Sequence, residues 1–156
     1  MVNFGTASFF GNPGDFDGDG KTDVAGSITE GSNRAWYYVS SLNPTQNVLN
    51  TRVPFGDVSA RRAQGDYDGD GKNDFVVQRN NGGGQAAFWT LLATGVVSPN
   101  VVFGTPTDVF VPGDYDGDGK TDFVARRNNG GAFQWYIFRS SDGARPITNL
   151  GIAGEP

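Results

Sequence analysis

The sequence GDYDGDGKNDF occupies residues 65–75, and two close copies, GDFDGDGKTDV and GDYDGDGKTDF, occupy residues 14–24 and 113–123. Each copy carries aspartates at positions 1, 3, 5 and 9, counted from its first aspartate, and glycines at positions 4 and 6. Four carboxylates this close repel one another unless a cation neutralises them. Ca²⁺ takes six to eight oxygen ligands and fits this pattern best, whereas Mg²⁺ prefers fewer protein ligands and keeps its waters. A solvated acidic turn is the alternative, which three repetitions at identical spacing disfavour.

The composition excludes several classes of chemistry. The chain of 156 residues has no cysteine and no histidine, so disulfides, thiol nucleophiles, zinc sites and histidine-based triads are ruled out. Twelve of the 17 acidic residues belong to the three loops, and the formal net charge of −5 therefore reflects local sites. Two carboxylates suffice for glycoside hydrolysis, but the acidic residues outside the loops are few and scattered along the sequence, so we expect no enzyme. They are Glu30, Asp57, Asp108, Asp142 and Glu155.

A repeat of about fifty residues organises the chain. A Phe-Gly pair begins at Phe4, Phe55 and Phe103, each time eleven residues before the first aspartate of a loop. A degenerate mark, Leu150-Gly151, begins a fourth unit. The predicted units are 4–54, 55–102 and 103–149, followed by the start of an incomplete fourth repeat at 150–156.

Each unit reads as four short strands. An extended stretch leads into the acidic loop, and a β-rich segment, an aromatic strand and a last strand that ends on Phe-Gly follow it. The turn before the aromatic strand contains RNNGG in two units, which predicts a hairpin. No helical periodicity is present, so the fold class is all-β, with three four-stranded antiparallel blades of the propeller type. We interpret Trp36, Trp89 and Trp135 as fillers between adjacent sheets at a matching place in each unit; stacking on a sugar is the alternative.

An EF-hand begins with a similar loop but requires a glutamate at position 12 and flanking helices. Position 12 is Gly26, Val77 or Ala125, and the flanking segments read as strands. This alternative is excluded.

The Phe-Gly pair at a fixed distance before GDxDGDGKxDF, within a fifty-residue all-β unit, resembles the FG-GAP or VCBS repeats, which form blades of integrin-α-like propellers. The resemblance covers nearly the whole chain. It implies one Ca²⁺ per loop, three per chain, held by the four aspartates and by the carbonyl of the lysine at position 7. We expect monodentate contact from the aspartates at positions 1, 3 and 5, and the position-9 aspartate, the last to reach the ion, is the best candidate for bidentate contact. The implied ligands are Asp15, Asp17, Asp19, Lys21 and Asp23 in the first loop, Asp66, Asp68, Asp70, Lys72 and Asp74 in the second, and Asp114, Asp116, Asp118, Lys120 and Asp122 in the third.

The number of units departs from the family pattern, because propellers close with roughly four to eight blades and this chain supplies three. We therefore expect either a homo-oligomer or the remaining blades of a larger propeller as partner. A two-fold arrangement of three-blade halves gives a six-bladed ring, and joining without closure gives a filament.

The function implied is a calcium-binding, non-catalytic module of an exported or cell-surface protein, acting in adhesion, ligand binding or as a scaffold. The first alternative is a calcium-dependent lectin in which Tyr37, Trp89 or Tyr136 stacks on sugar rings, and the second is a self-assembling structural protein. We expect a glycan or protein ligand, no nucleic acid and no membrane insertion. The first ten residues lack the pattern of a signal peptide, so an extracellular location requires a signal segment that this chain does not carry.

Overall fold

The structure is a computed structural model that describes residues 10–42 and 52–152, and within these ranges the chain forms strands, turns and loops without a helix. The described part therefore contains no helix long and apolar enough to cross a membrane. The first Phe-Gly pair, at Phe4, and the last residues of the predicted fourth unit lie outside the described residues.

Three four-stranded antiparallel sheets follow one another along the chain, which confirms the predicted fold class. In each sheet every strand pairs with the next one in sequence, as in a meander. The first sheet contains β1 (Phe10–Gly11), β2 (Val24–Glu30), β3 (Asn33–Val39) and β4 (Val53–Asp57). The second contains β5 (Arg61–Arg62), β6 (Phe75–Gly82), β7 (Gln85–Leu91) and β8 (Val97–Val102). The third contains β9 (Val109–Phe110), β10 (Phe123–Asn129), β11 (Ala132–Phe138) and β12 (Ile147–Ile152).

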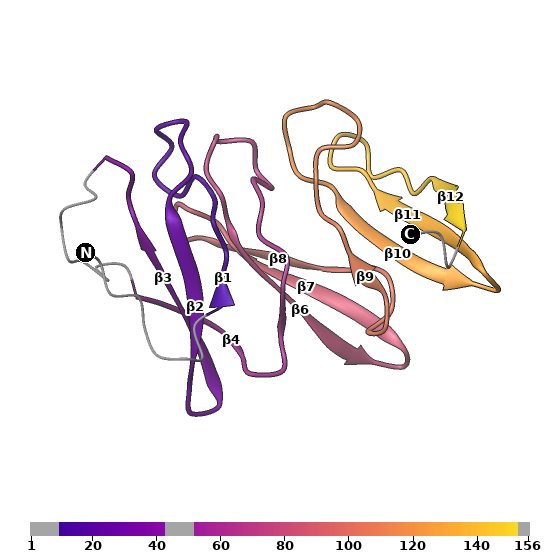
Figure 1. Ribbon diagram of the computed structural model, residues 1–156, viewed down its shortest axis with the longest axis horizontal. Coiled ribbons are helices and arrows are strands. Elements are labelled where there is room, and N and C mark those ends of the chain that lie inside the picture. The colour runs from indigo at the N-terminus through magenta and orange to yellow at the C-terminus, as the bar shows by residue number, and fades with distance from the viewer. Residues whose placement is uncertain (1–9, 43–51, 153–156) are drawn as a thin grey trace.

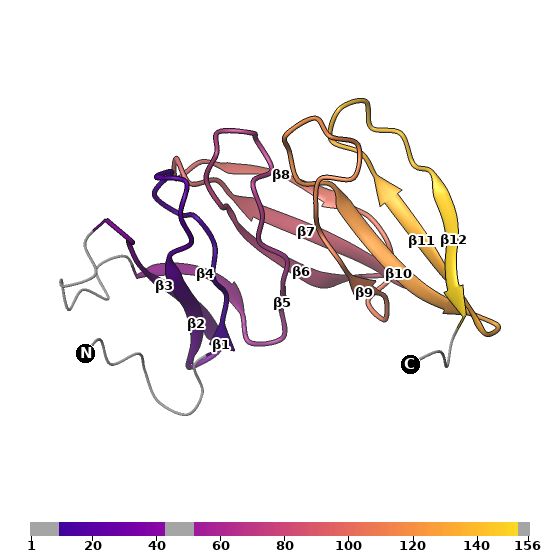
Figure 2. The same ribbon diagram turned by 45° about the horizontal axis from the view of Figure 1, so that its top comes forward.

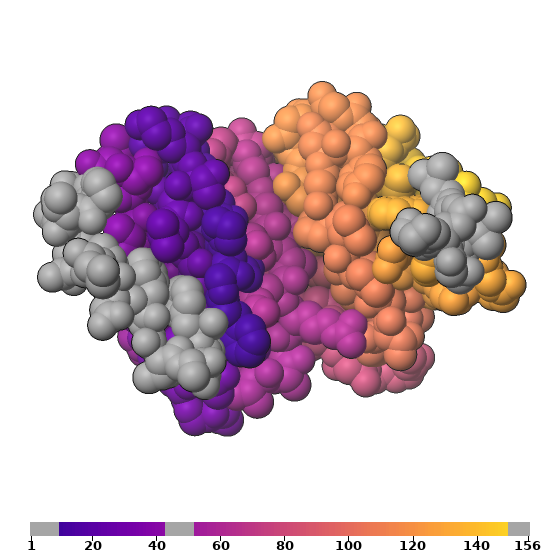
Figure 3. All heavy atoms as spheres, viewed as in Figure 1, coloured from indigo at the N-terminus to yellow at the C-terminus, as the bar shows by residue number. Residues whose placement is uncertain are grey.

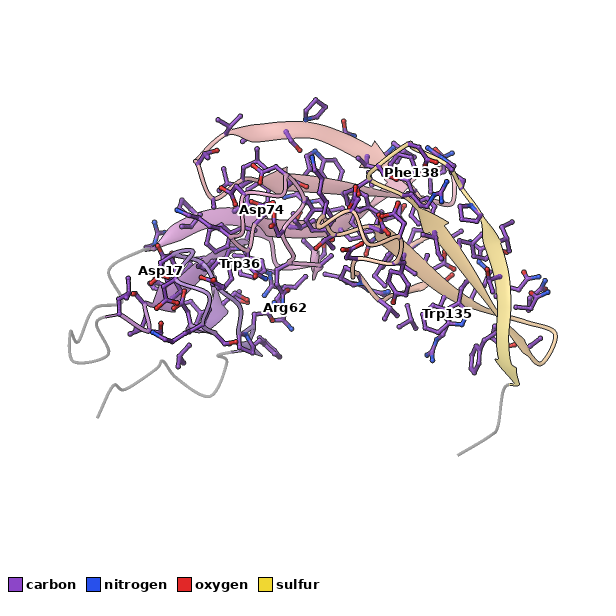
Figure 4. All side chains as sticks on the ribbon, turned by 90° about the horizontal axis from the view of Figure 1, so that it is seen from above. Asp17, Trp36, Arg62, Asp74, Trp135 and Phe138 are labelled. Carbon is purple, nitrogen blue, oxygen red and sulfur yellow. The ribbon has the colours of Figure 1, made fainter. Side chains whose placement is uncertain are left out.

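The sheets stand side by side in sequence order along the longest axis of the molecule (Figure 1). The loop between the first two strands of each sheet projects from the same edge, so the three acidic loops form a row (Figures 1 and 2). The space-filling view shows the same succession from indigo to yellow (Figure 3). Seen from above, the sheets follow a curve (Figure 4). The repeat units proposed from the Phe-Gly spacing remain a prediction. The last strand of the first sheet contains Phe55-Gly56, that of the second ends one residue before Phe103, and that of the third contains Leu150-Gly151.

One apolar cluster fills each junction between neighbouring sheets. Residues of β2 and β3 alternate between two faces, as the period of a strand requires, and Trp36, 1% exposed, lies on the face toward the second sheet. Its ring meets Phe75 edge-on at 5.6 Å between centroids. At the second junction the ring of Phe88 contacts those of Phe110 and Phe123, with 4.6 and 4.9 Å between ring centroids. Aromatic rings are thus prominent at both junctions, where they pack together with alanine and valine side chains.

The Phe-Gly pairs are part of these junctions. Phe55 and Phe103 pack in the first and second clusters respectively. Gly56 has φ +92°, and a Cβ added there would stand 2.9 Å from Cγ1 of Val77 in the next sheet. The glycine therefore allows the last strand of one sheet to approach the next sheet closely.

The tryptophans do not occupy one matching place, which corrects the interpretation of their spacing. Trp36 pairs with Ser27 and Trp135 with Arg126, and these are equivalent positions, but the residue at that place in the second sheet is Phe88. Trp89 lies one step further along, opposite Val77. Because successive residues of a strand point to opposite faces, Trp89 faces the first sheet, not the third.

Candidate metal centres

The three acidic loops share one hydrogen-bond scaffold. The carboxylate at position 1 accepts two backbone N–H groups: Gly18 donates to Oδ1 of Asp15 at 2.7 Å and Gly20 to Oδ2 at 2.8 Å. The same pairs recur at Asp66 and Asp114 with distances of 2.6–2.9 Å. The glycines at positions 4 and 6 have φ between +79° and +87° in all three loops, a conformation that a residue with a Cβ rarely adopts. These glycines wrap the backbone around the first aspartate.

The carboxylates at positions 3 and 5 are each fixed by the N–H two residues further on. Asp19 donates its N–H to Asp17 at 3.0 Å, and Lys21 donates its N–H to Asp19 at 2.8 Å. The other two loops repeat both bonds. In these turns one oxygen of each carboxylate accepts a backbone N–H, and the second oxygen can bind another partner.

The aspartate at position 9 sits at the base of each loop. Asp23, Asp74 and Asp122 are at most 1% exposed and pair with the glycine before position 1 in an isolated bridge. One oxygen of Asp23 accepts the N–H of Phe16 at 2.8 Å, and the other accepts the N–H of Ser41 at 2.8 Å. The second and third loops repeat this pattern. Burial, with Asp68 and Asp66 nearby, raises the pKa of Asp74 to about 6.

The scaffold brings carboxylate oxygens together in each loop. One oxygen from each of three aspartates lies within 4.8 Å of the others. The groups are Asp15, Asp17 and Asp19, then Asp66, Asp68 and Asp70, then Asp114, Asp116 and Asp122. The position-9 carboxylate is a member of the group only in the third loop, where it takes the place of Asp118. The bidentate contact expected of position 9 remains a prediction, as does the carbonyl contact of Lys21, Lys72 and Lys120.

Serine hydroxyls, which the analysis of the sequence did not identify, cover two of the loops. Ser40 donates to Asp17, and Ser41 donates to Oδ2 of Asp19 at 2.6 Å. In the third loop Ser140 donates to Asp118 at 2.7 Å and Ser141 donates to Asp116 at 2.5 Å. The bond from Ser41 lowers the pKa of Asp19, and the bond from Ser140 lowers the pKa of Asp118. The Ser-Ser pair after the aromatic strand in two units was the available signal.

The middle loop differs in this respect. Ala93 occupies the place of Ser41 and Ser140, since its N–H donates to Asp74 as theirs do to Asp23 and Asp122. Within residues 10–42 and 52–152 no hydroxyl donates to Asp68 or Asp70. The three centres are thus alike in backbone and unlike in their outer partners.

The donor set fits a hard divalent cation. Each loop offers several carboxylate oxygens within a small radius, and oxygen is the ligand that Ca²⁺ takes from proteins. Both oxygens of the position-9 carboxylate already accept an N–H, but each oxygen retains a second lone pair. The acidic residues outside the loops that the structure describes are all engaged elsewhere. Glu30 pairs with Arg52, Asp57 with Arg79, Asp108 with Arg127 and Asp142 with Arg139.

Comparison with known proteins agrees with the geometry. The sequence model of the FG-GAP-like repeat matches residues 15–77 and 66–125, which together contain the three acidic loops and more than half of the chain. A search of curated proteins and a search of solved structures gave no match.

Proposed function

Because the chain belongs to the FG-GAP-like repeat family, whose repeats indicate a module of the β-propeller type, we propose that it is a calcium-binding, non-catalytic propeller module of an exported or cell-surface protein. In this role it provides a surface for adhesion or ligand binding, or a scaffold. The observation that carries the proposal is the identical backbone scaffold of the three loops, each of which gathers three carboxylates within 4.8 Å. Bound Ca²⁺ would neutralise the mutual repulsion of these groups and stabilise the folded loops.

The pairing of the remaining carboxylates supports a non-catalytic role. A glycosidase needs two carboxyl groups that flank one substrate bond. Asp57, Asp108 and Asp142 instead each contact an arginine, at 3.0 Å for Asp57–Arg79 and 2.7 Å for Asp108–Arg127. These ion pairs hold the carboxylates in their charged form, which is unsuitable for a general acid.

An exported or cell-surface location is the part of the proposal that the affinity for Ca²⁺ can test. Calcium modules outside cells bind with dissociation constants of about 10⁻⁴–10⁻³ M, and we expect affinities in that range. Measured affinities in the nanomolar range would contradict an extracellular module of this kind.

Calorimetric titration tests the metal proposal. We expect three Ca²⁺ per chain at pH 7 and much weaker binding of Mg²⁺. Asp68→Ala should remove the middle site and leave the outer two, because each loop's hydrogen-bond scaffold lies mostly within its own sheet. Asp142→Ala, which removes the same charge from an exposed position outside the loops, is the matched control and should leave all three sites. Fewer than two sites in the unaltered protein, or equal binding of Mg²⁺, would refute the proposal.

Carbohydrate binding is a second candidate, favoured by two equivalent hollows at the junctions between sheets. One, of about 350 Å³, is lined by Phe55, Gly56, Arg79 and Trp89. The other, of about 340 Å³, is lined by the corresponding set Phe103, Gly104, Arg127 and Tyr136, with further residues of the third sheet. In each hollow the guanidinium lies over the aromatic ring, at 5.2 Å from Trp89 and 4.6 Å from Tyr136. A glycan array probed with and without Ca²⁺ distinguishes a lectin from a module that binds no sugar.

A further inference from the structure

The two junctions between sheets are built alike. In the first, the loop aromatic Phe16 stacks on Phe75, the first residue after the next loop, at 5.0 Å between ring centroids. In the second, Tyr67 contacts Phe123 at 4.6 Å. The residue equivalent to Phe75 in the first sheet is Val24, and the residue equivalent to Tyr67 in the third sheet is Tyr115. The same junction thus occurs twice within the chain. The first sheet also carries the residues of one side of such a junction, and the third sheet carries the residues of the other side.

The loops repeat a second contact at the same junctions. Asn73 donates its N–H to the carbonyl oxygen of Asp15 at 2.5 Å, and Thr121 donates to that of Asp66 at 2.6 Å. The lysine before each donor lies over a glycine of the preceding loop: a Cβ added at Gly18 would stand 2.8 Å from Cε of Lys72, and one at Gly69 3.1 Å from Cε of Lys120. In the first loop the donor and lysine are Thr22 and Lys21, and in the third the acceptor and glycine are Asp114 and Gly117.

The junction residues on the outer faces of the first and third sheets are exposed. Tyr115 is 46% exposed whereas Phe16, at the equivalent position, is 4% exposed. Val24 is 58% exposed whereas Phe75 is 6% exposed. A Cβ added at Gly117 would meet no atom within 4 Å. The side chain of Lys21 is 69% exposed. In Figure 4, Phe138 lies on the side of the third sheet toward the second sheet, and the opposite side of the third sheet faces away along the curve.

We propose that the first sheet of one copy of this chain docks on the third sheet of a second copy and reproduces the internal junction between them. Val24 would pack on Tyr115, the stem of Lys21 would lie over Gly117, and the N–H of Thr22 would donate to the carbonyl of Asp114. The partner is a second copy because a single chain presents both complementary halves of this contact. The contact is heterologous, so two copies close into a ring of six sheets if the curvature returns to its start, and otherwise extend as a filament.

This inference rests on the propeller-type module of the proposed function and identifies its partner. The docking proposal and the proposed function can fail separately. A chain that binds three Ca²⁺ and stays monomeric overturns the docking alone. A chain that associates without binding Ca²⁺ overturns the metal proposal alone.

Light scattering in saturating Ca²⁺ provides the first test. We expect twice the monomer mass of 16.6 kDa for a closed ring and larger masses for a filament, and either supports the contact. Val24→Glu and Tyr115→Glu each place a charge at the centre of the contact and should weaken association at least about tenfold. Val97→Glu is the matched control, since Val97 is a similarly exposed valine, 60% exposed, on β8 of the middle sheet. A monomeric unaltered chain, or equal effects of Val24→Glu and Val97→Glu, refutes the proposal.

Disulfide trapping tests the register, because the chain has no cysteine of its own. At the second junction a Cβ added at Gly65 would lie 2.9 Å from Cβ of Thr121. A disulfide needs about 3.5–4.5 Å between the two Cβ atoms, so a small outward shift would let the equivalent pair Gly113 and Thr22 cross-link across two copies. Thr22→Cys and Gly113→Cys, prepared as separate proteins, should form a disulfide-linked dimer in high yield only when they are mixed and oxidised. Mixing Gly113→Cys with Thr94→Cys, an exposed site in the turn between β7 and β8, is the control. Equal yields in the two mixtures contradict the proposed register.

Discussion

The backbone N–H of Asn73 lies 2.5 Å from the carbonyl oxygen of Asp15, so the second acidic loop is joined directly to the first. The third loop is joined to the second by the corresponding bond from Thr121 to Asp66. Each of these bonds starts next to the position-9 aspartate of one loop and ends at the position-1 aspartate of the loop before it. The row of acidic loops is thus a continuous edge that crosses both junctions between sheets.

Chelation should lower the stability of the whole chain and not of one sheet. Removing Ca²⁺ leaves four repelling carboxylates in each of three loops that are bonded in series. We expect excess chelator to lower the melting temperature by more than about 10 °C, in a single transition, and we expect added Ca²⁺ to restore it. Differential scanning calorimetry measures both. A melting curve that does not change in chelator would show that the metal has no structural role.

The serine hydroxyls should distinguish the three sites. Ser41 and Ser140 each hold an outer oxygen of a position-5 carboxylate, whereas Ala93 has no hydroxyl at the equivalent place. Ser41→Ala should weaken Ca²⁺ binding at the first site about threefold and leave the others unchanged, because the carboxylate is no longer pre-oriented. Ala93→Ser should strengthen the middle site by a similar factor. Titration of each variant against Thr94→Ala as control measures the effect, and a change of equal size at all sites would contradict it.

The acidic loops and the order of the strands could be predicted from sequence because both depend on local patterns. The spacing of the aspartates and glycines fixes the loop, and the short β-rich and aromatic segments bounded by Gly- and Asn-containing turns mark the strands that follow it. A fifty-residue repeat then extends one unit to the others.

The position of Trp89 could not be predicted in this way. The hairpin between β6 and β7 contains a register shift between Asn80 and Gly82, and Trp89 is the fifth residue of its strand, whereas Trp36 and Trp135 are the fourth. A shift of one residue moves a side chain to the other face of a sheet. The spacing of the tryptophans along the sequence does not reveal such a bulge.

The side-chain partners of these aspartates also could not be predicted from the sequence. Ser41 is 22 residues from Asp19, and Arg127 is 19 residues from Asp108. Such pairs form because strands that are distant in sequence become neighbours in a sheet. Neither the types of these residues nor their separation in sequence predicts the contacts unless the register of the sheets is known.

The ion pair of Asp108 should give the protein a measurable dependence on acid. Burial of this carboxylate disfavours its ionisation, but hydrogen bonds from Arg127 and Thr105 outweigh burial and hold its pKa below the ordinary value. Its contribution to stability is therefore complete above about pH 4 and is lost as the pH falls through the lowered pKa. Asp108→Asn should cost about 2 kcal/mol at pH 7 and should flatten the decline in stability below about pH 4.

Urea denaturation between pH 2.5 and 7, in chelator so that metal release does not contribute, measures this dependence. Asp142→Asn is the control, because its ion pair with Arg139 is exposed and an exposed pair contributes little. Equal losses for the two variants at pH 7 would show that burial of Asp108 does not matter.

The glycine of the Phe-Gly pair should be required for two reasons: its positive φ, and the close packing between sheets that leaves no room for a Cβ. Gly56 and Gly95 have similar φ values, +92° and +87°, but a Cβ at Gly56 would meet Val77 at 2.9 Å and one at Gly95 would meet nothing within 4 Å. Gly95→Ala should cost about 1 kcal/mol, the penalty for a side chain in the left-handed region. Gly56→Ala should cost about 2–4 kcal/mol, because the clash with Val77 adds to that penalty and separates the first two sheets. Urea denaturation of the calcium-loaded variants compares them, and costs equal within about 0.5 kcal/mol would mean that the junction accommodates a methyl group.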